Sequence, residues 1–134
     1  MDTTTLQTAL ADYFAPWVQA LGLQVQGFDA DSVTLRLPHS DALARTGGIV
    51  CGQAMMAAAD TAMALALVNH FGAFRPCTTV QLQSSFLRPL SGQDALMQAR
   101  VLRAGKSLAF GEIDLRGATD GKSVCRASTT YALL

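Results

Sequence analysis

The sequence has few charged residues and no excess of either sign. Only 15% of its 134 residues are charged, and 10 lysines and arginines balance 10 aspartates and glutamates. The basic residues form no cluster or stripe, whereas contacts with nucleic-acid phosphates need clustered lysine and arginine. We therefore expect no nucleic-acid partner. Half of the residues are hydrophobic, which excludes a disordered chain and predicts a well-filled core.

Cysteine and histidine are scarce and widely spaced. The three cysteines, Cys51, Cys77 and Cys125, form no Cys-x-x-Cys pair and leave one unmatched. This pattern favours the reducing cytoplasm over a disulfide framework. The two histidines, His39 and His70, lie far apart, so the sequence offers none of the ligand spacings that are typical of zinc. We expect a cytoplasmic protein that uses no metal and no cofactor.

The sequence also lacks an obvious membrane-directed segment. Its first residues, MDTTT, carry neither the positive charge nor the apolar run of a secretory signal peptide. The longest apolar stretch is interrupted by Asp60, and we take it to be too short for a bilayer, which needs about 18 or more apolar residues. We expect no membrane partner.

The spacing of apolar residues predicts the order helix, two strands, long helix, four strands. Apolar positions recur about once per helical turn in the first twenty residues, and Pro16 predicts a break there because proline cannot continue a smooth helix. Apolar and polar residues alternate in the expected strands. The long helix is expected at 52–70, a loop at 38–48, and strands at 23–28, 32–37, 77–87, 94–102, 107–115 and 123–134.

The long helix is apolar nearly all round, so it must be enclosed on most sides. Among the predicted elements, only an antiparallel sheet is available to enclose it. Ala109, Gly111 and Ile113 share one face of their strand, and the small Ala109 and Gly111 would let the sheet approach the helix. We predict an α+β fold, a single domain over 1–134, with the sheet wrapped around one central helix. The open edges of such a sheet favour pairing with a second copy.

Asp60 raises a question, because a buried carboxylate is costly unless it is paired or hydrogen-bonded. The residues around it follow a known signature. Cys51-Gly52-Gln53 stands where that signature has His-Gly-Gly before a helix, and Asp60 follows Gly52 by eight positions. "AADTA" (58–62) is similar to the "LAD-T-A" pattern of the helix. The sequence thus resembles hotdog-fold thioesterases of the PaaI-like and 4-hydroxybenzoyl-CoA type.

The resemblance extends over nearly the whole chain from about residue 22. "TTVQLQSSFLRP" (78–89) and "GQDALMQARVLRAGKSLAFGEIDL" (92–115) are similar to strands of the family. The chain departs from the pattern where Cys51 and Gln53 replace a histidine and a glycine, and where Arg45 replaces a common asparagine. The loop "ARTGGIVCG" is similar to a subgroup with an Arg-x-Gly-Gly loop.

The resemblance implies hydrolysis of an acyl-CoA or aryl-CoA thioester to free acid and CoA, by a homodimer or homotetramer. The Gly52 N–H would polarise the thioester carbonyl at the start of the helix, and Asp60 would attack it or activate a water. Thr79 matches a position at which the family offers a hydroxyl to that water. The expected substrate contacts are Arg45, Gly48, Gln53, Arg88, Arg103 and Lys106, with Arg88, Arg103 and Lys106 directed at CoA phosphates.

Other interpretations stay open. Asp60 could be a structural carboxylate that is bonded to strand amides or to Arg45, and Thr79 could be an ordinary strand residue. Cys51 could be a nucleophile, because helix N-termini lower thiol pKa values. The whole chain could be a non-catalytic acyl-binding module. It could also be a hotdog hydratase or dehydratase, although that activity needs a histidine paired with an acid and the spacing of His39 from Asp60 does not match.

Overall fold

The computed structural model describes residues 1–134. Its elements follow the predicted order, and Pro16 begins the second helix as expected. The helices are α1 (Thr3–Asp12), α2 (Pro16–Gln19), the short 3-10 helix η1 (Asp41–Leu43) and α3 (Gly52–Phe71). The strands are β1 (Gln24–Phe28), β2 (Ser32–Leu37), β3 (Ala44–Arg45), β4 (Ile49–Val50), β5 (Cys77–Phe86), β6 (Ala95–Ala104), β7 (Leu108–Gly117) and β8 (Ser123–Leu133).

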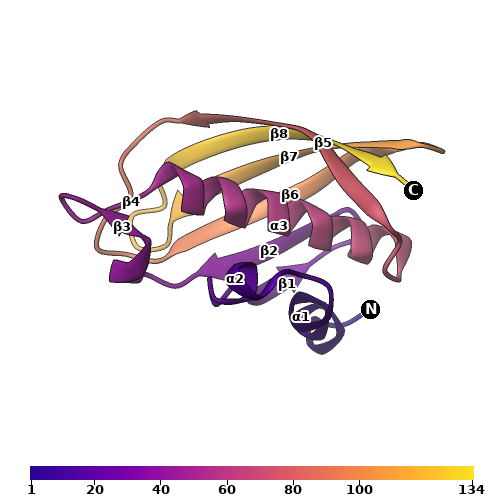
Figure 1. The fold of residues 1–134 in the computed structure, drawn as a ribbon, viewed down its shortest axis with the longest axis horizontal. Helices are drawn as coiled ribbons and strands as arrows, with labels where there is room; N and C mark the ends of the chain where they lie inside the picture. The colour runs from indigo at the N-terminus through magenta and orange to yellow at the C-terminus, as the bar shows by residue number, and fades with distance from the viewer.

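Six of the strands form one antiparallel sheet in the order β1-β2-β6-β7-β8-β5. The sheet curves behind α3, which runs across its face, while α1 and α2 lie beside β1 and β2 (Figure 1). This arrangement confirms the predicted α+β fold, an antiparallel sheet around one long central helix. Strands β1 and β5 are the two edges of the sheet, so β5 pairs with β8 alone.

Small strand residues let the sheet approach α3 closely, as predicted. Ala109 and Ile113 are buried on the inner face of β7, on either side of Gly111. A Cβ atom at Gly111 would overlap the side chain of Met63 and would lie 2.9 Å from the carbonyl oxygen of Arg100. The sheet therefore contacts the helix at a distance that only glycine permits at this position.

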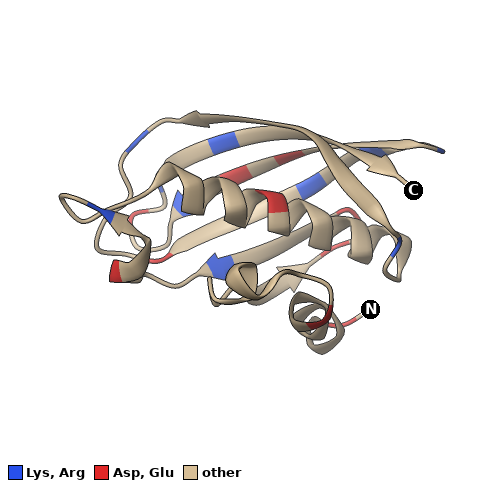
Figure 2. Cartoon of the chain, in the orientation of Figure 1, with Lys and Arg blue, Asp and Glu red and all other residues tan.

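The sheet leaves one stripe of α3 uncovered. Gln53 is exposed, and Met56, Ala57, Asp60 and Ala64 are half-buried, whereas the other residues from 54 to 69 are buried. These five positions are spaced by three or four residues, so they share one face of the helix. Asp60 is the one acid of α3 and gives the helix its red band in Figure 2. Asp60 thus lies on the part of the core helix that the sheet covers incompletely.

The prediction that the apolar stretch is too short for a bilayer was wrong on length. The helix α3 has 20 residues and is long and apolar enough to cross a membrane by length and composition. Most of its residues are buried inside this fold, however, and packing against the sheet accounts for its apolar composition.

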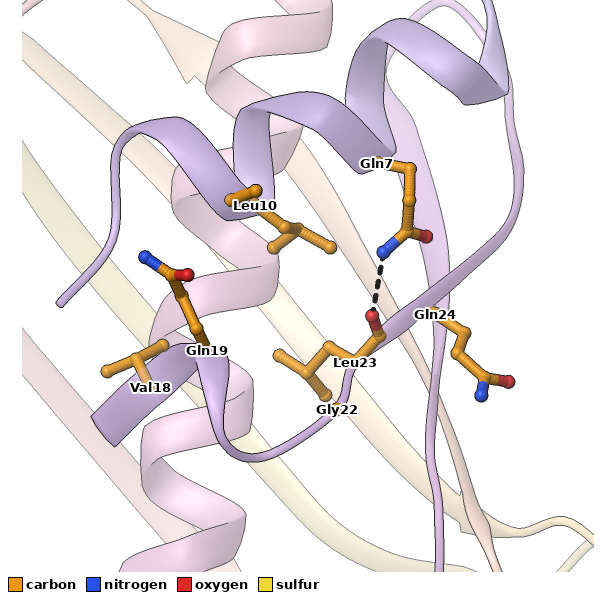
Figure 3. A pocket seen from close by; sticks show the side chains of 8 residues that line it. Gln7, Leu10, Val18, Gln19, Gly22, Leu23 and Gln24 are labelled. Atoms are coloured by element: carbon orange, nitrogen blue, oxygen red, sulfur yellow. Dashed lines mark hydrogen bonds between the residues drawn. The ribbon is translucent and has the colours of Figure 1, made fainter. Parts of the chain in front are cut away.

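The first helix, α1, is fixed beside β1 through the side chain of Gln7. Its Nε2 donates to the carbonyl oxygen of Leu23 at 3.0 Å, and its Oε1 accepts from the Val25 N–H at 2.8 Å. A hollow of about 280 Å³ lies beside this contact and is lined by Leu10, Val18 and other residues without titratable side chains (Figure 3). Gln7 therefore holds α1 against the edge strand.

The segment that was expected to be a loop, 38–48, carries some regular structure. It contains η1 and the two-residue strand β3, which pairs with β4. Gly47 and Gly48, at φ +93° and +76°, make the turn between these strands, a left-handed conformation that favours glycine. Such short elements have no periodicity, so the sequence pattern does not predict them.

Candidate active site

Asp60 is held in place by two hydroxyl groups from the sheet. Thr79 on β5 donates from Oγ1 to Asp60 Oδ1 at 2.9 Å, and the Tyr131 hydroxyl on β8 donates to the same oxygen at 2.6 Å. Thr79 and Tyr131 are directly opposite each other across the β5–β8 pair. The second carboxylate oxygen, Oδ2, accepts no hydrogen bond from the protein. One oxygen is thus fixed to the fold, and the other is free for a water or a substrate.

Tyr131 was not predicted from the sequence, although it makes the shortest hydrogen bond to Asp60. It is 3% exposed. Burial, followed by the negative charge of Asp60, raises the pKa of its hydroxyl far above the ordinary value. The phenol therefore stays protonated and acts as a hydrogen-bond donor to the carboxylate rather than as a base. Its only signal in the sequence is a tyrosine on the buried face of the last strand.

An apolar cavity of about 280 Å³ begins at Asp60. It is lined mainly by hydrophobic side chains, with the Thr79 and Tyr131 hydroxyls beside the acid. Cys77 also lines it, and burial followed by the charge of Asp60 raises the pKa of the thiol. That cysteine therefore remains a neutral thiol. The arrangement combines one carboxylate with an apolar pocket, as the binding and hydrolysis of a largely apolar acyl group would require.

A second hollow, of about 450 Å³, lies at the N-terminus of α3. Gly52, Arg45 and Arg88 line it together, so the structure brings these three predicted residues to one place. Gly52 is the first residue of α3 and the phenyl ring of Phe86 lies against it, 3.3 Å from the position of a Cβ atom. A helix N-terminus with two nearby guanidinium groups is suited to negative charge.

The other predicted substrate contacts are more scattered. Gln53 is exposed in the first turn of α3, and the Gly48 N–H donates to the Arg45 carbonyl oxygen within the β3–β4 turn. Arg103 is the next-to-last residue of β6 and Lys106 lies in the turn between β6 and β7, which is at the other end of the sheet from β3 and β4 (Figure 1). The single chain therefore does not bring Arg103 and Lys106 together with Gly52.

Gly52 and Asp60 of one chain do not share a single reaction centre. They are eight residues apart on α3, and eight residues of α-helix rise about 12 Å. Reacting atoms in a productive complex are only about 3–3.5 Å apart. The carboxylate and the helix N-terminus of one chain are thus too far apart to act on the same atom.

Several of the alternative partners are separated in the structure. Arg45 donates to the carbonyl oxygen of Thr46 and makes no ion pair with Asp60. His39 lies 3.9 Å from Asp41 and does not line the Asp60 cavity, so the chain has no histidine–Asp60 pair of the kind that a hydratase needs. No three histidine, cysteine, aspartate or glutamate side chains cluster as metal ligands would.

Known proteins resemble this chain along most of its length. A protein of Thermoplasma acidophilum named "Putative esterase" is 25% identical over 112 residues, which are 84% of this chain and 83% of that protein. A solved structure from Silicibacter sp. TM1040, described as a "putative thioesterase", is 30% identical, covers 100% of this chain and 92% of its own, and superposes with a TM-score of 0.89.

The fold is also that of the E. coli PaaI protein from the phenylacetic acid degradation operon. That structure is 18% identical, covers 98% of this chain and 93% of its own, and has a TM-score of 0.84. The family model described as the thioesterase superfamily matches residues 47–124, a segment that begins before α3, includes Gly52 and Asp60, and ends in β8. This chain belongs to the thioesterase superfamily, with the hotdog fold.

Proposed function

We propose that the protein hydrolyses an acyl-CoA or aryl-CoA thioester to the free acid and CoA. Membership of the thioesterase superfamily supports thioester hydrolysis in general. The observation that carries the assignment to Asp60 is its geometry: Oδ1 is fixed by two hydroxyl groups, while Oδ2 is free at the start of an apolar cavity. A base or nucleophile needs this combination of fixed position and one reactive atom.

The complete site requires two copies of the chain. Asp60 and Gly52 lie about 12 Å apart along α3, so they can act on one carbonyl only if each comes from a different subunit. The uncovered stripe of α3 and the open edge of β5 provide a surface for such a partner. We propose a homodimer or a larger assembly built from it, in which Asp60 faces the partner subunit's Gly52.

The reaction then follows from the roles of these groups. Asp60 removes a proton from a water whose oxygen attacks the thioester carbon, and the partner subunit's Gly52 N–H donates to the developing oxyanion. The intermediate collapses as the carbon–sulfur bond breaks, and the CoA sulfur takes the proton back from Asp60. In the alternative order, Asp60 attacks the thioester carbon, the carbon–sulfur bond breaks as CoA leaves as a thiolate, and water then hydrolyses the resulting anhydride to the free acid and the Asp60 carboxylate. Thr79 and Tyr131 hold the carboxylate in both versions.

The CoA portion is assigned to the hollow at the N-terminus of α3. Arg45 and Arg88 line it beside Gly52, and guanidinium groups pair well with phosphates. The apolar cavity at Asp60 receives the acyl or aryl group. A bound thioester thus spans the two subunits. Its CoA portion lies near the N-terminus of α3 in one subunit, and its acyl or aryl group lies beside Asp60 of the other.

The test is a panel of acyl-CoA and aryl-CoA thioesters with release of free thiol as the readout. Asp60→Asn keeps the shape of the side chain and both acceptor contacts at Oδ1, but it cannot take a proton. We expect turnover to fall about a hundredfold or more, while the melting temperature holds or rises because a partly buried charge is removed. Glu112→Gln, an exposed acid on the outer face of β7, is the matched control and should keep full turnover.

A non-catalytic acyl-binding module is the second candidate. It is favoured by the same two hydrogen bonds, because they tie α3 to β5 and β8 and would by themselves explain the carboxylate. In that case no member of the thioester panel releases thiol faster with the protein than without it.

A further inference from the structure

Two aromatic rings close the far end of the cavity that begins at Asp60. Tyr13 and Phe74 stack with their ring centroids 4.2 Å apart and their planes at 12°. Both rings line the cavity, although they come from segments 61 positions apart in the sequence. Each side chain is about half exposed, at 50% and 46%, so one face of the pair meets the cavity and the other meets solvent.

The pair lies between two hollows. On the inner side is the apolar cavity of about 280 Å³ that contains Asp60. On the outer side is an open hollow of about 400 Å³, which is lined partly by Thr4, Thr8 and Asp12. Tyr13 and Phe74 line both. Together with Val68, which also lines both, they lie between the cavity that contains Asp60 and the hollow beside α1.

The cavity runs along α3 from the acid toward the stacked rings. Asp60, Ala64, Val68 and Phe71 line it in succession on one side of the helix. At Gly72 the chain leaves α3 with φ +76°, a left-handed C-cap that favours glycine. The chain then turns so that Phe74 meets Tyr13 just after the end of α1. The acid thus lies at one end of the cavity and the stacked rings at the other.

We propose that the Tyr13–Phe74 pair is the end wall that sets the longest acyl group this enzyme accepts. The proposal rests on the thioesterase function proposed above. At about 30 Å³ for each water-sized atom, 280 Å³ holds about nine non-hydrogen atoms. The preferred substrates are therefore medium-chain acyl groups of about octanoyl size or acyl groups with a single ring, and longer chains meet the stacked rings.

The test compares the specificity of variants across butanoyl-, octanoyl-, dodecanoyl- and hexadecanoyl-CoA. Tyr13→Ala and Phe74→Ala open the end wall, so the ratio of kcat/KM for dodecanoyl-CoA to that for octanoyl-CoA should rise about tenfold, as burial of about two further methylenes would give. Ala64→Leu fills the cavity near the acid and should shift the preference toward butanoyl-CoA. Phe28→Ala removes an aromatic ring of similar exposure on β1, 41%, and should leave the ratio unchanged.

A binding measurement separates failure of this proposal from failure of the proposed function. Isothermal titration calorimetry with non-hydrolysable S-alkyl-CoA thioethers, from butyl to hexadecyl, reports the length limit without any chemical step. We expect wild-type affinity to stop rising near octyl and the Tyr13→Ala limit to move to longer chains. The proposed end wall is contradicted if affinity depends on chain length in the same way in the wild type and Tyr13→Ala, or if no thioether binds. Absence of thioester turnover with the length limit intact overturns only the proposed function.

Discussion

The Tyr131→Phe substitution removes one hydroxyl and leaves the ring that fills the core. The wild-type hydroxyl donates to Asp60 Oδ1 at 2.6 Å from a residue that is 3% exposed. Hydrogen bonds to charged groups contribute about 1.5–3 kcal/mol to stability. Because the half-buried carboxylate keeps its contact with Thr79 and no donor is left without a partner, we expect the free energy of unfolding to fall by about 1–2 kcal/mol at pH 7.

The same substitution has a predictable pH signature. Because the pKa of Tyr131 is raised in the folded protein, the unfolded chain releases the phenolic proton above about pH 10 while the folded chain retains it. The wild type is therefore expected to lose up to about 1.4 kcal/mol of stability per pH unit above pH 10 through this one group. Tyr131→Phe lacks that loss, so its deficit should shrink between pH 10 and pH 11. Urea unfolding at pH 7, 10 and 11 measures both effects.

Turnover gives the third readout, because a phenol that only filled the core would not affect it. Loss of the hydroxyl loosens Asp60, so we expect kcat to fall about tenfold with little change in KM. Thr129→Val is the matched control: Thr129 is a buried β8 residue whose hydroxyl donates to the Gln81 carbonyl oxygen. Thr129→Val should lose stability, but it should keep the wild-type kcat and the wild-type loss of stability above pH 10. An unchanged kcat in Tyr131→Phe would refute the positioning role.

Four further predictions concern other parts of the molecule. Cys51→Ala should keep most activity, and a loss beyond about a hundredfold in folded protein would instead support a thiol nucleophile. Gly111→Ala should cost about 1–3 kcal/mol in urea unfolding, because the added methyl overlaps Met63. The backbone N–H of His39 and then the Arg36 guanidinium lower the pKa of Asp94. The stability that this ionised carboxylate contributes is therefore lost as the pH falls below about 4, and Asp94→Asn should flatten that loss. Analytical ultracentrifugation should find at least a dimer at micromolar concentration, and a monomer would contradict the shared site.

Local patterns were enough to predict the main elements, and they led to a candidate for the catalytic acid. The apolar run from 52 to 70 and the alternating strands have the periods of the elements that they form, and Pro16 begins α2 as proline at a first helical position does. Asp60 and Gly52 were identified by their spacing in a family signature. Only the structure showed that Asp60 lies on the uncovered stripe of α3, because a helix with small apolar residues on every side gives no amphipathic pattern.

The rest of the site depends on contacts that are remote in sequence. Tyr131 lies 71 positions after Asp60 and reaches it only because β8 pairs with β5 opposite Thr79. Tyr13 and Phe74 meet through the ends of two helices. No local periodicity encodes such pairs, since they follow from the order of strands and the packing of helix ends.

Subunit complementation distinguishes a site shared by two subunits from a site within one chain. Asp60→Asn removes the acid, and Gly52→Pro removes the assigned N–H at the first helical position, after Cys51 at φ −68°, ψ 151°. The melting temperature of Gly52→Pro is measured as well, because the Phe86 ring lies 3.3 Å from the position of a Cβ atom at Gly52. Each variant alone should be nearly inactive. Mixed dimers, isolated by two different affinity tags after coexpression, should recover about half of the wild-type turnover, because one of the two sites of a twofold dimer then combines an intact Asp60 with an intact Gly52. Mixed dimers as inactive as either variant would contradict the shared site.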